Sequence, residues 1–231
     1  MIQILVILIL GLGIPGGLLL WDLSCWKWIE LGAEAWLASI VIKAVLGIAI
    51  SAFSHRFLST ERSMACLWGS WSALCELGVS IYVLKTQIQP RLQDAIGFGV
   101  GAGALETLLL GVIHFYGILR KTSENKPNTS QDFFVIWGMV FERVSYLGGY
   151  VGARGLVWLS LQYWFFIPTL LVAFLSFGSI DGISSYAQVK GWNWSDPTIC
   201  RKFYGFHISV VLIQILIFAL SCGALYFLGK I

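Results

Sequence analysis

Residues 205–229 read GFHISVVLIQILIFALSCGALYFLG, a run of 25 residues that contains no Asp, Glu, Lys or Arg. An apolar run of about 18 or more residues is long enough to cross a bilayer as an α-helix. Six further runs of this kind precede it, at approximately 3–20, 35–54, 64–86, 94–118, 133–160 and 165–187. They are too long for barrel strands and lack the alternation of such strands. The sequence therefore predicts an all-α, polytopic transmembrane helix bundle of about seven spans.

The composition of the chain leads to the same class of protein. Of its 231 residues, 58% are hydrophobic and only 12% are charged, whereas a soluble domain has about 25% charged residues. The net charge of +3 is too small to indicate a nucleic-acid partner. We therefore expect one integral membrane domain over residues 1–231, with the lipid bilayer as its immediate partner.

The loops and the helix-breaking residues give the expected topology. Eight lysines and arginines fall in loops on one side of the bundle, and four fall on the other side. Basic loops stay in the cytoplasm, so the N-terminus is predicted to be cytoplasmic. The fifth run is long and is expected to tilt or break near Gly148 and Gly149, and Pro168 marks the start of the sixth run.

Seven ionisable side chains lie inside the predicted spans, and they are the most informative residues of the chain. A charge at the centre of a bilayer costs about 2.5–3.5 kcal/mol on insertion scales. Seven of them are tolerable only if they pair with one another or face water. The seven are Lys43, Glu76, Glu106, Glu142, Arg143, Arg154 and Asp181.

Depth along the helices suggests how these charges pair. Lys43 and Glu76 both lie roughly 12–15 Å from the same end of neighbouring spans at 1.5 Å per residue, which predicts a structural ion pair. Glu106 and Arg143 lie near the middle of consecutive spans and form the second predicted pair. Glu142 is about 100° around the helix from Arg143, so we expect it to point elsewhere, towards Asp181 or a wet cavity.

Glycines precede Glu106 at intervals that favour close helix packing. Gly97 with Gly101 and Gly99 with Gly103 form two overlapping small-xxx-small patterns, which allow another helix to approach closely. The two interpretations are plain helix packing and backbone brought near Glu106 to shape a site.

Three stretches together resemble a known family. GFGVGAGALETLLLG (97–111), FERVSYLGGYVGARGLVW (141–158) and LLVAFLSFGSID (170–181) resemble, in order and spacing, the YhfC-type intramembrane protease family, which is related to the CAAX-processing and bacteriocin-processing membrane proteases. The resemblance covers about residues 94–185, a protease-like core, and implies a bacterial cytoplasmic (inner) membrane.

If the chain is active, the resemblance implies catalytic roles for five residues, Glu106, Glu142, Arg143, Tyr150 and Asp181, and it also shows where this chain departs from the family. The family has one histidine eight residues after the Glu-Arg glutamate and another four residues before the last acid. Tyr150 and Phe177 stand at these positions. Imidazoles with a carboxylate hold zinc or activate water, and Phe177 does neither.

Three functions follow from these observations. The preferred one is a catalytically degenerate, protease-like protein that serves as a structural or regulatory subunit among other membrane protein subunits, without a cofactor. The second is an active intramembrane peptidase that uses Glu106 and Glu142 as an acid–base pair, with His114 or His207 as substitutes and zinc as its implied metal. The third is a small-solute or ion transport component, because intramembrane charges also mark transport paths.

Overall fold

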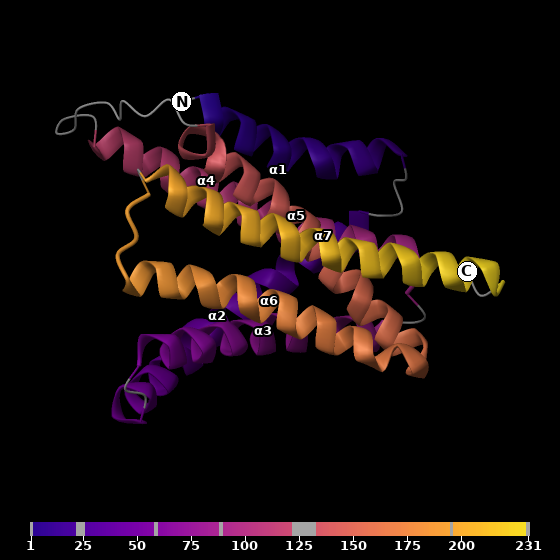
Figure 1. Ribbon diagram of the computed structural model, residues 1–231. Helices are drawn as coiled ribbons and strands as arrows, with labels where there is room; N and C mark the ends of the chain where they lie inside the picture. The colour runs from indigo at the N-terminus through magenta and orange to yellow at the C-terminus, as the bar shows by residue number, and fades with distance from the viewer. Residues whose placement is uncertain are drawn as a thin grey trace.

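The computed structural model describes residues 2–21, 26–57, 60–87, 90–121, 133–194 and 196–229. Over these residues the chain forms seven α-helices and one short 3₁₀ turn (Figure 1). Each predicted apolar run corresponds to one α-helix, although the sixth run begins two residues before its helix and the last run ends two residues after its helix. The elements are α1 (Ile2–Trp21), α2 (Trp26–Phe57), α3 (Glu61–Thr86), α4 (Leu92–Lys121), α5 (Phe133–Gln162), η2 (Trp164–Phe166), α6 (Ile167–Val189) and α7 (Pro197–Phe227).

Two helices extend beyond the predicted runs, and a third is more regular than expected. α2 and α7 begin well before residues 35 and 205, because segments that mix polar and apolar side chains, 26–34 and 197–204, continue each apolar run as helix. α5 runs without a break through Gly148 and Gly149, so the expected break there is wrong. Pro168 does lie in the first turn of α6, where its missing N–H leaves no helical hydrogen bond unmade.

Among the described residues, five helices are long and apolar enough to cross a membrane. These are the segments Trp26–Ala52, Glu61–Thr86, Leu92–Ile113, Ile167–Val189 and Pro197–Phe227. Large apolar side chains are exposed along them, for example Ile48 at 76% and Leu220 at 65%. Exposed apolar helix faces are what a lipid-facing surface requires. The bundle is thus typical of an integral membrane protein, and seven passes remain a prediction.

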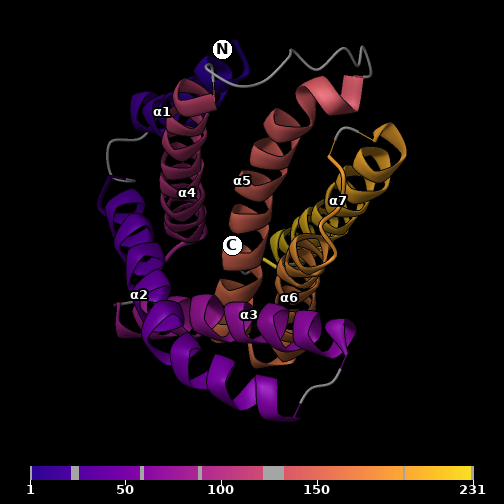
Figure 2. The same ribbon diagram turned by 90° about the vertical axis from the view of Figure 1, so that its left-hand side faces the viewer.

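α5 is the central helix of the bundle. It packs against α4 on one side and against α6 and α7 on the other, as Figure 2 shows. It also carries three of the seven intramembrane charges, Glu142, Arg143 and Arg154. The helix with the most intramembrane charges is therefore surrounded by other helices of the bundle.

The glycines before Glu106 serve two different neighbours. A Cβ on Gly101 would lie 1.9 Å from the carbonyl oxygen of Ile29 in α2. A Cβ on Gly99 would lie 2.7 Å from Cα of Val151 in α5. Both close helix approaches expected from the small-xxx-small patterns are present, one on each side of α4. They bring α2, α4 and α5 together just below Glu106.

Candidate functional site

Glu76 on α3 lies at the centre of a buried charge cluster. The predicted ion pair with Lys43 of α2 is present, on Oε1 of the glutamate. The other carboxylate oxygen, Oε2, lies 3.1 Å from Nη2 of Arg154 on α5. Only 3% of Glu76 is exposed. One carboxylate thus pairs with two cations and joins three helices.

A second group of charges surrounds Arg143 on α5. Its Nη1 lies 3.3 Å from Oε1 of Glu106 on α4, which is the pair expected from depth. Its Nη2 lies 2.9 Å from Oε1 of Glu142. The expectation that Glu142 points away from Arg143 is therefore wrong. Adjacent Cβ atoms do diverge by about 100°, but the long, forked guanidinium presents separate N–H groups to both carboxylates.

Asp181 on α6 is held by hydroxyl groups rather than by Glu142. Ser72 of α3 donates its hydroxyl hydrogen to Oδ2 of Asp181. The hydroxyl of Tyr146 on α5 lies 3.5 Å from Oδ1. The described hydrogen bonds of Asp181 therefore come from neutral hydroxyl groups, whereas Glu76, Glu106 and Glu142 each pair with a cation.

Tyr150 stands beside both groups of charges. Nε1 of Trp36 on α2 donates a hydrogen bond of 2.9 Å to the Tyr150 hydroxyl. The Tyr150 ring packs edge-on against Phe177 at 5.1 Å between ring centroids. The guanidinium carbon of Arg154 lies 4.7 Å from the centroid of the Tyr150 ring and 5.0 Å from that of Phe177. A fixed cation thus covers both aromatic rings.

These side chains surround a cavity of about 370 Å³, here called the central cavity. Its polar wall consists of Lys43, Glu76, Glu106, Tyr146, Tyr150 and Asp181. On the side between α2 and α4 it is lined by Ile40, Leu109 and Ile113, which are 38%, 43% and 54% exposed. The central cavity therefore joins a polar interior to a lateral opening on the apolar surface.

Three of the five residues with implied catalytic roles meet at this cavity. Glu106, Tyr150 and Asp181 line it from α4, α5 and α6. Arg143 adjoins it through Glu106. Glu142, which was expected to face Asp181 or a wet cavity, is not part of the described lining of this cavity and pairs with Arg143 instead.

Three residues of the site, Trp36, Ser72 and Tyr146, are not among those that the sequence singled out. Arg154 is among them as an intramembrane charge, but the sequence indicated no partner for it. Helical spacing carried the missing signal. Tyr146, Tyr150 and Arg154 are four residues apart on one face of α5, as are Ser72 and Glu76 on α3.

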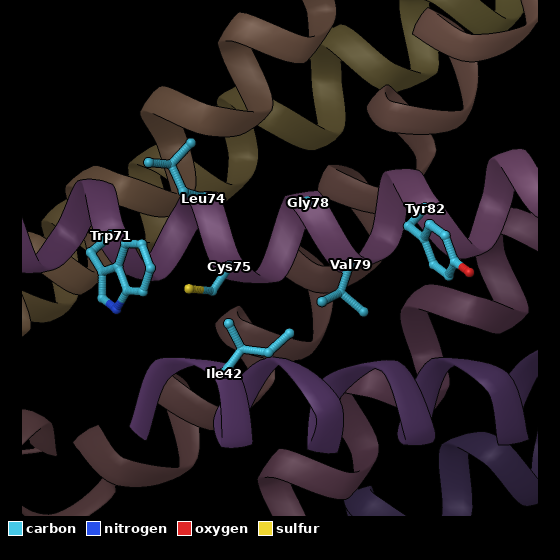
Figure 3. Close-up of a pocket in the computed structure, with 7 residues that line it drawn as sticks. All are labelled: Ile42, Trp71, Leu74, Cys75, Gly78, Val79 and Tyr82. Atoms are coloured by element: carbon cyan, nitrogen blue, oxygen red, sulfur yellow. The ribbon is translucent and has the colours of Figure 1, made fainter. Parts of the chain in front are cut away.

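A second, apolar hollow lies on the outside of α3. It measures about 390 Å³ and is lined by Ile42 of α2 and by α3 residues between Trp71 and Tyr82. Figure 3 shows Ile42, Cys75 and Val79 between the two helices. Leu74 and Tyr82 at its edge are 57% and 69% exposed. Because its described lining carries no charged side chain, this hollow suits lipid chains rather than chemistry.

The implied zinc does not fit the residues present. Phe177 offers no ligand atom, Tyr150 already accepts the Trp36 N–H, and the Arg154 cation covers both rings. Zinc requires three or four N, S or O ligands around an open position. In the described part of the chain, no three His, Cys, Asp or Glu side chains are grouped to hold a metal.

The His114 side chain lies outside the described residues. His207 is buried, and its Nδ1 lies 2.9 Å from the carbonyl oxygen of Phe203.

Replacing Tyr150 by Phe is expected to lower the free energy of unfolding by about 1–2 kcal/mol, because it leaves the buried Trp36 N–H without an acceptor. Tyr82→Phe is the matched control, since Tyr82 is 69% exposed. Thermal unfolding in one detergent measures both. Equal midpoints for the two variants would contradict the role given to the Trp36–Tyr150 hydrogen bond.

Comparison with known proteins identifies no relative of this chain. No family model matches the chain, and neither a curated protein nor a solved structure matches it.

Proposed function

We propose that this chain is a protease-like integral membrane protein without catalytic activity, and that it acts as a structural or regulatory subunit of a membrane complex. The proposal takes the resemblance to YhfC-type intramembrane proteases as its starting point. In this interpretation the ancestral acidic residues were kept to hold the helices together. The apolar outer faces of the helices are then available to other membrane subunits as well as to lipid.

One observation carries this proposal: the position of the Arg154 guanidinium. It lies over the Tyr150 and Phe177 rings, the two positions at which the resemblance implies histidines. It also pairs with Glu76, which would otherwise be an available anionic ligand. A permanent positive charge at this place opposes a metal cation electrostatically and already engages the carboxylate of Glu76.

A second candidate, the active peptidase, has one observation in its favour. Glu106, Asp181 and Tyr150 line the same cavity, so an acid, a base and a hydroxyl group are close together. Against it, Arg143 binds both Glu106 and Glu142, so the two carboxylates of the proposed acid–base pair are already engaged by one cation. Glu106→Gln distinguishes the two functions: any peptide cleavage that depends on Glu106 would contradict the degenerate assignment.

The transport function has less support from the geometry. A carrier of this kind would need an unpaired cation in its cavity, available to a substrate. Lys43 and Arg154 instead both pair with Glu76. Breaking either pair would leave a buried charge without its partner, which is costly.

Native mass spectrometry of the protein extracted in mild detergent tests the proposed function. We expect a chain without bound metal that carries a stoichiometric membrane-protein partner. A monomer with one zinc would contradict the proposal and support the hydrolase.

Restoring the two histidines tests the same idea from the opposite direction. The triple variant Tyr150→His, Phe177→His, Arg154→Met is expected to bind about one zinc per chain, because it supplies two imidazoles beside Glu76 and removes the opposing cation. Zinc content after dialysis is the measurement, and Arg154→Met alone is the control. Stoichiometric zinc in the unaltered chain would contradict the role given to Arg154.

A further inference from the structure

The central cavity shares part of its wall with a second polar cavity. This second cavity, here called the entry cavity, measures about 270 Å³. It is lined by Trp68, Trp71 and Ser72 of α3 and by Ser184, Ser185 and Gln188 of α6. Lys43 and Asp181 line both cavities. These two side chains therefore separate the two spaces.

The entry cavity leads towards one end of the bundle. Gln188 is exposed and lies one residue before the end of α6. At the same end, Lys190 forms an ion pair with Glu61, whose hydrogen bond raises the pKa of Lys190. Asp181 is seven residues before Gln188, or about 10 Å along the helix. The hydroxyl groups of Ser184 and Ser185 line the space between them.

The charges of the cluster do not balance. Among the described intramembrane residues, there are three basic side chains and four acidic ones. The basic ones are Lys43, Arg143 and Arg154, and the acidic ones are Glu76, Glu106, Glu142 and Asp181. Glu76, Glu106 and Glu142 each have a basic group within ion-pair distance. The described hydrogen bonds of Asp181 come instead from the hydroxyls of Ser72 and Tyr146. An ionised carboxylate with neutral partners is costly at this depth, and a bound proton removes that cost.

We propose that Asp181 is a proton-exchange site that water reaches through the entry cavity. The protonated carboxyl group releases its proton to a water molecule in this cavity, leaving a carboxylate and a hydronium ion, and takes a proton back by the reverse step. The charged and titratable groups facing it are Lys43 from α2, Glu76 from α3, Glu106 from α4 and Tyr146 from α5. Release leaves the cluster with one additional negative charge beside the central cavity. This proposal is independent of the proposed function, since it requires neither catalysis nor a partner.

Labelling with dicyclohexylcarbodiimide, a hydrophobic reagent, tests the protonation of Asp181. The reagent adds to protonated carboxyl groups in apolar surroundings and forms a stable N-acylurea, which peptide mass spectrometry locates. We expect one adduct per chain, on Asp181, and about tenfold less labelling for each pH unit above the pH at which the carboxyl ionises. Asp181→Asn should lose the adduct. Labelling of Glu76 or Glu106 with Asp181 unmodified would overturn the proposal. Suppression of labelling by sodium ions at constant pH would also overturn it, because Asp181 would then bind sodium rather than exchange a proton alone.

Cysteine accessibility tests the water route separately. In sealed vesicles, Ser185→Cys inside the entry cavity and Gln188→Cys at its mouth should both react with a charged, membrane-impermeant thiol reagent from the same side. Ile113→Cys, at the lipid-facing side of the central cavity, is the matched control and should react only with a hydrophobic maleimide. Reaction at position 188 without reaction at position 185 would show that water does not reach Asp181 by this route and would overturn the proposal.

Discussion

Replacing Glu76 by alanine is expected to destabilise the bundle more than any other change to the charge cluster. The variant leaves Lys43 and Arg154 without their shared carboxylate, and removing one partner of a buried ion pair costs about 3–5 kcal/mol. Two cations lose their partner here. We therefore expect little folded protein after detergent extraction, measured as the monodisperse fraction in size-exclusion chromatography and as the thermal unfolding midpoint.

The two partners of Glu76 provide a graded comparison. The Lys43 side chain is 22% exposed and that of Arg154 is 2% exposed. Lys43→Met should therefore be the mildest of the three variants, because Glu76 keeps its most buried partner. Arg154→Met should be intermediate. Lys190→Gln, which breaks the exposed pair with Glu61, serves as the control and should leave the midpoint unchanged. A midpoint of Glu76→Ala equal to that of Lys43→Met would contradict the shared role of Glu76.

The positions of the helices could be predicted from the sequence, because each helix is marked by a long apolar run. The run in α7 is an example, since residues 205–229 contain no charged side chain. Counting the membrane passes is harder for α5, where three charges lower the hydropathy although the helix is central. The charged side chains of α5 are shielded by neighbouring helices instead of being replaced by apolar residues. The sequence of α5 alone does not show which helices pack against it.

The ion pairs of the site could be predicted where two charges lie at the same depth on consecutive helices. They could not be predicted where the length of a side chain decides which partner it contacts. Lys43 with Glu76 and Arg143 with Glu106 follow from equal depth on consecutive helices. Glu142 was misplaced because the prediction used the direction of Cβ and ignored the length of the arginine side chain. Arg154 reaches Glu76 across 78 positions of sequence, a contact fixed by the packing of α3 against α5.

A close contact between α3 and α6, the helices that carry Ser72 and Asp181, offers the second large effect. Gly69 of α3 faces Gly178 and Gly182 of α6, and a Cβ on Gly69 would lie 2.2 Å from the carbonyl oxygen of Gly178 and 2.7 Å from the backbone nitrogen of Gly182. Real Cβ atoms do not approach backbone so closely, and backbone cannot rotate away as a side chain can. Gly69→Ala must therefore push α3 and α6 apart.

We expect Gly69→Ala to lower the free energy of unfolding by about 3 kcal/mol, at the upper end of the usual range for overpacking. Gly78→Ala is the matched control on the same helix, because a Cβ there meets nothing within 4 Å. It should be neutral or stabilising by up to about 1 kcal/mol, since alanine favours helix over glycine. Thermal unfolding of both variants in one detergent gives the difference, and equal midpoints would show that α3 and α6 do not cross as described.

Separation of α3 from α6 also has a chemical consequence, because Ser72 lies one turn after Gly69 and donates its hydrogen bond to Asp181 on α6. Ser72→Ala removes this hydrogen bond without adding volume, whereas Gly69→Ala moves the whole helix. If the hydroxyl contact controls the protonation of Asp181, both variants should change its labelling by the carbodiimide, but only Gly69→Ala should lose much stability. A change in labelling confined to Gly69→Ala would instead assign control of the carboxyl group to helix spacing.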